Sequence, residues 1–142
     1  MIPAHAMSAI ERKPVVFACA GCSAAGRLAY DLALEFDRRQ AAEMSCLAGL
    51  AAELKPFTAL VKGRPVWVVD GCPIGCAGAI FARLGRSIDY HIQLDEYGVR
   101  KKTGLPREID LEALADGVAG QAPSQANTSN TCDLAQQQGS GR

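Results

Sequence analysis

Short apolar runs alternate with amphipathic segments along the chain, and this alternation constrains its fold more than any other feature. Residues 14–19 (PVVFAC) and 65–70 (PVWVVD) are rich in β-branched and aromatic side chains and have the short length of buried strands. Residues 42–46 (AEMSC) and 89–94 (DYHIQL) predict two further strands. Strands that alternate with helices predict an α/β fold with a mostly parallel sheet, covered by helices on both faces.

Helices are predicted between and after these strands. The most regular pattern covers residues 23–39 (SAAGRLAYDLALEFDRR), where Ser23 can cap the amino end. Residues 47–55 (LAGLAAELK) are rich in alanine and are expected to form a connection. Further helices are predicted at residues 56–63, 76–85 and 110–118.

The chain has 142 residues, a length that suits one domain with a hydrophobic core. We expect a single three-layer, Rossmann-like α/β domain over residues 14–118, with a sheet of about four strands. Residues 1–13 are polar and aperiodic, and residues 119–142 are rich in Gln, Ser, Asn and Gly, so both ends are expected to be disordered. Cys132 lies in this tail and is expected to be an incidental thiol.

The formal net charge is zero, which gives no electrostatic reason to bind nucleic acid or an anionic membrane. No segment reaches the roughly 18 to 20 continuous apolar residues that a membrane-spanning helix needs. The amino end also lacks the apolar stretch of a secretory signal. These observations predict a cytoplasmic protein without nucleic-acid or membrane partners.

Five of the six cysteines fall where predicted strands end and helices begin. Cys19 and Cys22 follow the first strand, Cys46 closes the second, and Cys72 and Cys76 follow the third. Because parallel strands bring their carboxyl ends to one edge of a sheet, we expect these thiols to lie along that edge. In a reducing compartment, clustered cysteines bind metal or perform redox chemistry more often than they form structural disulfides.

Thiolates that lie close together repel one another unless they are protonated, oxidised or neutralised by a cation. A soft or borderline metal is the simplest neutralising cation, and tetrahedral zinc takes four sulfur ligands. Zinc would therefore use four of the five candidates. Two alternatives remain open: a thiol-redox protein or reductase that uses Cys19/Cys22 and Cys72/Cys76, and an iron–sulfur protein on the same cysteines.

The segments ACAGCS, AEMSCLAG, VVDGCPIGCA and HIQLDEYGVRKK occur in this order between about residues 14 and 103. This succession resembles the DGC-domain family of proposed zinc-binding proteins, named for an Asp-Gly-Cys like that at residues 70–72. The resemblance implies a cysteine-ligated zinc site whose biological role is poorly defined. The cysteines that fall on the family's motifs are Cys19, Cys22, Cys46 and Cys72, with Cys76 close behind.

Other motifs and single residues give weaker indications of function. Residues 21–28 (GCSAAGRL) contain the two glycines of a P-loop, but Arg27 and Leu28 stand where a lysine and a hydroxyl are needed. Arg27 is also out of register with the arginine of a cysteine-phosphatase loop. Asp70 is expected to brace the loop after its strand. His91 is expected to be a structural histidine at the edge opposite the cysteines.

Overall fold

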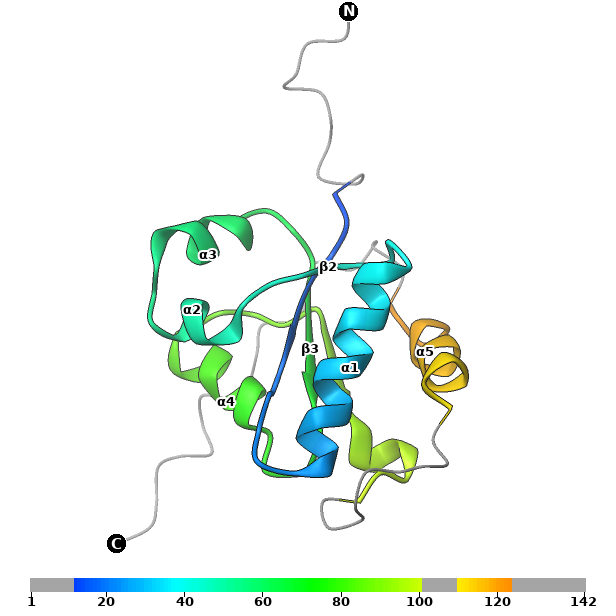
Figure 1. Ribbon diagram of the computed structural model, residues 1–142. Coiled ribbons are helices and arrows are strands. Elements are labelled where there is room, and N and C mark those ends of the chain that lie inside the picture. The colour runs from blue at the N-terminus through cyan, green and yellow to red at the C-terminus, as the bar shows by residue number, and fades with distance from the viewer. Residues whose placement is uncertain (1–11, 101–109, 124–142) are drawn as a thin grey trace, which may run out of the picture.

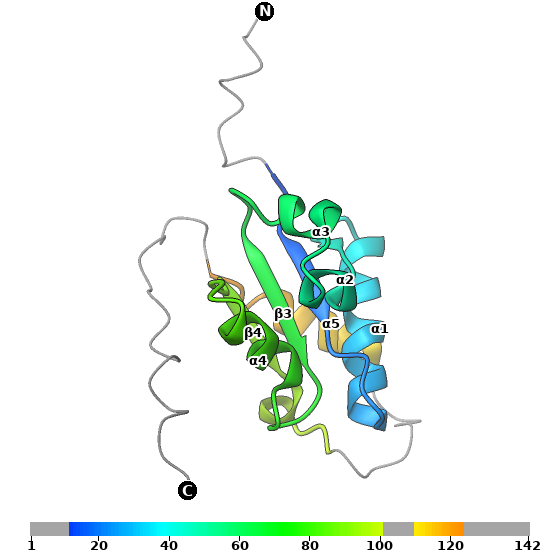
Figure 2. The same cartoon turned by 90° about the vertical axis from the view of Figure 1, so that its left-hand side faces the viewer.

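The computed structural model describes residues 12–100 and 110–123 and forms three layers. The strands are β1 (Val15–Ala18), β2 (Glu43–Met44), β3 (Val66–Asp70) and β4 (Tyr90–Gln93). The helices are α1 (Ala24–Arg38), α2 (Leu47–Ala51), α3 (Lys55–Leu60), α4 (Cys76–Arg83) and α5 (Leu111–Ala119), with a 3-10 turn, η2 (Leu94–Tyr97), after β4. The sheet lies in the middle, with α1 and α5 on one face and α2, α3 and α4 on the other (Figure 1, Figure 2).

All strands of the described sheet run parallel, in the order β2-β1-β3-β4. The predicted α/β class and parallel sheet are therefore confirmed. After β1 the chain passes to α1 on one face, whereas after β3 it passes to α4 on the other face (Figure 1). The adjacent strands β1 and β3 thus form the topological switch point, the place where α/β sheets most often bind ligands.

Local sequence signals explain why the main elements form where they do. All residues of β1 and β3 are buried, because helices cover both faces of the sheet, and this accounts for their unbroken apolar sequences. The Ser23 hydroxyl accepts a hydrogen bond from the Gly26 amide and caps α1 as predicted. Asp110 caps α5 in the same way, through the amides of Glu112 and Ala113.

Aromatic contacts join the three layers. Phe17 of β1 packs edge-on against Phe81 of α4, with ring centroids 5.4 Å apart. On the opposite face Phe36 of α1 meets Trp67 of β3 at 5.5 Å. Phe81 thus packs on β1 and Phe36 on β3 from opposite faces, and one cluster of buried residues extends through the sheet.

One helix was not expected. Residues 47–51, interpreted from sequence as part of a connection, form α2. The Cys46 sulfur accepts a hydrogen bond from the Gly49 amide at 3.3 Å and so acts as the amino-terminal cap of the helix. Gly49 itself packs against the Phe57 ring of α3, and a β-carbon at Gly49 would come within 2.3 Å of that ring. The contact explains the glycine inside such a short helix.

The expected disordered ends lie almost entirely outside the described residues. The arm predicted at residues 1–13 contributes only its last two residues to the structure, and the tail predicted from residue 119 contributes its first five. Ala119 closes α5, and Ala122 packs against the core. Cys132 lies outside the described residues. No helix in the part of the chain that the structure describes is long and apolar enough to cross a membrane.

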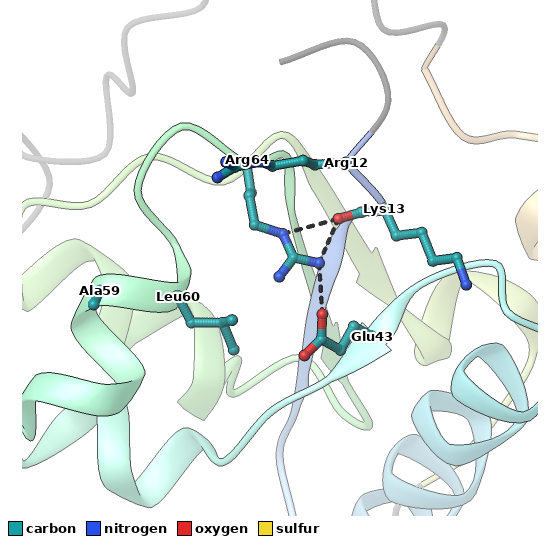
Figure 3. A pocket seen from close by; sticks show the side chains of 6 residues that line it. All are labelled: Arg12, Lys13, Glu43, Ala59, Leu60 and Arg64. Atoms are coloured by element: carbon teal, nitrogen blue, oxygen red, sulfur yellow. Dashed lines mark hydrogen bonds and ion pairs between the residues drawn. The ribbon is translucent and has the colours of Figure 1, made fainter. Parts of the chain in front are cut away.

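Arg64 ties the strands together at the amino edge of the sheet. Its guanidinium donates to the Lys13 carbonyl oxygen at 2.7 Å and pairs with the Glu43 carboxylate at 2.8 Å (Figure 3). The Arg64 side chain is only 10% exposed. The surrounding hollow, about 400 Å³, has no cysteine or histidine among the described residues that line it. This edge lies opposite the cysteine loops.

Candidate functional site

Two cysteine-bearing loops lie side by side at the carboxyl edge of the sheet. Residues 19–23 connect β1 to α1, and residues 71–75 connect β3 to α4. The two strands are paired in register, with Ala18 opposite Val69, so both loops leave the sheet at the same level (Figure 1). Neighbouring strands are about 4.8 Å apart, which sets the spacing at which the two loops begin.

Cys19 joins these loops through its sulfur. Its side chain is buried, and the sulfur accepts a hydrogen bond from the Gly71 amide at 3.2 Å. Burial raises the pKa of the Cys19 thiol, although the hydrogen bonds from Gly71 and Gly21 oppose that change. The nearby Asp70 and Cys72 raise the pKa further, since a negative charge beside the sulfur disfavours the thiolate. Without a cation, Cys19 is therefore held as a neutral thiol.

Gly71 allows the contact because it has no side chain. A β-carbon at this position would lie 2.2 Å from the Ala25 carbonyl oxygen and 2.7 Å from the Gly26 nitrogen. Both atoms belong to the backbone of the first turn of α1, which cannot move aside as a side chain can. Glycine is therefore required here by close approach between the β3–α4 loop and α1.

Asp70 holds the amino end of α4. Its side chain is 1% exposed, and its two oxygens accept the amides of Ala77 at 2.8 Å and Gly78 at 2.9 Å. Gly75, at the capping position, offers no side-chain cap, so Asp70 satisfies these amides from the preceding strand. Burial alone would raise the pKa of Asp70, but hydrogen bonds from His91, Gly78 and Ala77 together lower it. The expected bracing role of Asp70 is observed.

His91 lies elsewhere than expected. Its Nε2 is 2.7 Å from the second Asp70 oxygen, and its side chain is 24% exposed. The sequence interpretation placed His91 at the edge opposite the cysteines, which is wrong. β4 pairs with β3 so that His91 is opposite Val68, and the ring reaches along the sheet to the last residue of β3. Gly78 makes room, because a β-carbon there would lie 2.7 Å from the imidazole.

The remaining cysteines of the two loops are more accessible. Cys72 is partly buried and packs against the core, whereas Cys22 and Cys76 are exposed. Cys22 directly precedes the Ser23 cap of α1, and Cys76 is the first residue of α4. Each loop therefore carries one inner thiol and one outer thiol at the start of a helix.

Cys46 belongs to a third loop with a different course. β2 ends at Met44, level with Val16, whereas β1 and β3 continue farther toward the carboxyl edge. The exposed Cys46 then caps the amino end of α2, where its sulfur accepts a hydrogen bond from the Gly49 amide. The structure thus brings the Cys19 and Cys72 loops into contact and leaves Cys46 on the adjoining segment.

Among the residues that the structure describes, no group of three or more Cys, His, Asp or Glu side chains is close enough to hold a metal ion. The five cysteines carry free thiols. The chemical type of these side chains suits a thiophilic metal, because the two adjoining loop regions supply four cysteine sulfurs. Coordination would require the outer thiols of Cys22 and Cys76 to turn inward.

Arg27 has a local partner. Its guanidinium pairs with Asp31, one turn along α1, at 3.0 Å. Both side chains lie on the surface, so the pair is an ordinary helix-surface contact worth a few tenths of a kcal/mol, roughly 0.3 to 0.5. The structure therefore shows Arg27 in a local contact within α1.

Comparison with known proteins shows the family to which the chain belongs. The chain is 41% identical over 103 residues to the anaerobic and virulence modulator AnvM of Pseudomonas aeruginosa strain PAO1, covering 71% of this chain and 79% of the relative. No solved structure matches the chain. The DGC domain matches residues 15–118, which runs from the start of β1 to the next-to-last residue of α5. The chain belongs to the DGC domain family.

Proposed function

We propose that this protein binds one zinc ion through thiolates of the β1–α1 and β3–α4 loops. The observation that carries the proposal is the hydrogen bond between the Cys19 sulfur and the Gly71 amide, at 3.2 Å. It fixes one thiol-bearing loop against the other at the switch point of a parallel sheet. Binding sites in such sheets form at this position, because the two connections that follow the adjacent strands lead to opposite faces of the sheet.

Four thiols from two loops match the preference of zinc for a tetrahedral sulfur site, with Zn–S distances of about 2.3 Å. Cys19 and Cys72 would form the inner half of the site and Cys22 and Cys76 the outer half. Zinc binding would release the proton that burial favours on the Cys19 thiol, because the metal takes thiolates as ligands. The site would close over the metal as the outer side chains turn inward.

The strand order favours Cys76 over Cys46 as the fourth ligand. β1 and β3 are direct neighbours, whereas β2 lies on the far side of β1 and leaves the sheet earlier. We therefore propose Cys19, Cys22, Cys72 and Cys76 as the ligands, with Cys46 outside the set.

A thiol-redox protein is the alternative function. It would need an attacking thiolate, and the most buried candidate, Cys19, has a raised pKa that disfavours this form. An iron–sulfur cluster would use the same four sulfurs and would show a visible absorption band in protein purified without oxygen. The relative from Pseudomonas aeruginosa is named as an anaerobic and virulence modulator. We accordingly propose a regulatory use of the metal in preference to an enzymatic one.

Single cysteine-to-serine variants test the ligand set. Zinc would be measured by mass spectrometry in protein prepared anaerobically, with Arg64→Met as a control at the opposite edge. We expect about one zinc per chain in the wild type, in Arg64→Met and in Cys46→Ser, because these keep all four sulfurs. Loss of zinc in Cys46→Ser but not in Cys76→Ser would overturn the choice of ligands. A wild type without zinc would overturn the function itself.

A further inference from the structure

Asp70 joins three elements of the fold through one buried carboxylate. It ends β3, it accepts hydrogen bonds from the Ala77 and Gly78 amides in the first turn of α4, and it contacts His91 of β4. Residues 71–75 form the loop between Asp70 and the first residue of α4. Cys72 lies within this loop and Cys76 follows it, so the carboxylate holds both ends of the segment that carries these cysteines.

His91 completes the environment of that carboxylate. An ion buried to this extent is stable only when its oxygens are fully hydrogen-bonded. Two amides and the imidazole supply the donors, at 2.8, 2.9 and 2.7 Å. Removal of the imidazole would leave that carboxylate oxygen with the Gly78 amide as its donor. The carboxylate would then gain by turning toward water and releasing the start of α4.

Gly78 leaves the space in which His91 contacts Asp70. Gly78 lies between the helix backbone and the imidazole, and a β-carbon there would be 2.7 Å from the ring and 3.4 Å from the Asp70 carboxylate. A helix interior normally prefers alanine to glycine. The glycine in α4 therefore accommodates the histidine at the expense of helix propensity.

We propose that His91 acts through Asp70 as a positioning residue that holds the β3–α4 loop in the geometry needed for zinc. The inference rests on the zinc site proposed above, and it assigns a role to two residues that supply no metal ligand. Residues that orient ligands in this indirect way commonly change metal affinity by about 10- to 100-fold when they are replaced.

His91→Leu and His91→Gln test the proposal. The glutamine amide can still donate to Asp70, whereas leucine cannot. In metal-free protein we expect the Ala77 and Gly78 amides of His91→Leu to exchange with solvent at least about 10-fold faster than in the wild type, as loss of a charge-assisted hydrogen bond allows. His91→Gln should restore slow exchange. Arg64→Met, at the other edge, controls for a general loss of stability.

Zinc affinity, measured by competition with a chelator, provides the second readout. We expect an affinity about 10-fold or more below that of the wild type for His91→Leu, with recovery in His91→Gln and no change in Arg64→Met. Wild-type affinity or wild-type amide exchange in a folded His91→Leu protein would overturn the inference while leaving the zinc site intact. A wild type that binds no zinc would instead overturn the proposed function, and this inference with it.

Discussion

Replacement of Gly71 by alanine tests the contact between the two cysteine loops. The added β-carbon would lie 2.2 Å from the Ala25 carbonyl oxygen, so the loop and α1 must separate by roughly 1 Å to reach van der Waals contact. That movement would also break the 3.2 Å contact between the Gly71 amide and the Cys19 sulfur. Overpacking together with a lost buried hydrogen bond should lower the free energy of unfolding by about 3 kcal/mol.

Urea denaturation of metal-free protein under reducing conditions would measure this loss. Gly21→Ala is the matched control, because it makes the same change in the neighbouring loop, where nothing lies within 4 Å of the new β-carbon. The control should stay within about 0.5 kcal/mol of the wild type. Equal stability of the Gly71 and Gly21 variants would refute the argument that close backbone approach requires glycine in the DGC motif.

Two further predictions concern elements away from the site. Hydrogen bonds from Arg38 and Arg39 lower the pKa of Glu35 to about 2 from an ordinary 4.5, so this carboxylate stabilises the fold above pH 4.5 and loses that effect as the pH falls toward 2. The stability difference between the wild type and Glu35→Gln, followed by urea denaturation at several pH values, should therefore shrink over that interval, and a constant difference would contradict the pairing. Gly117→Ala fills open space on α5 and should stabilise the protein by about 0.5 to 1 kcal/mol, through better helix propensity; a lower melting temperature would count against this.

The sequence predicted those elements whose signals are local. α1 follows from an amphipathic repeat with Ser23 as its cap, and β3 follows from an unbroken apolar run. The alternation of strands and helices was enough to predict a parallel sheet, and a parallel sheet was enough to predict that the cysteine loops share an edge. No side-chain detail is needed for these steps, because they depend on periodicity and chain direction alone.

Features that depend on register could not be predicted. The His91–Asp70 contact requires β4 to pair with β3 at a particular offset, which no local pattern specifies. α2 was missed because it is short and its cap is the sulfur of Cys46, which is not among the usual capping residues. The zinc site was predicted at the level of loops, whereas the orientation of each thiol depends on rotamers and on the metal itself.

The zinc content and coordination of wild-type protein purified anaerobically without chelator test the central claim most directly. X-ray absorption at the zinc edge, together with metal analysis, would measure both quantities on one sample. We expect about one zinc per chain, surrounded by four sulfur atoms at about 2.3 Å. Less than about half an equivalent of zinc, with all thiols freely titrating, would contradict a site that needs four sulfur ligands.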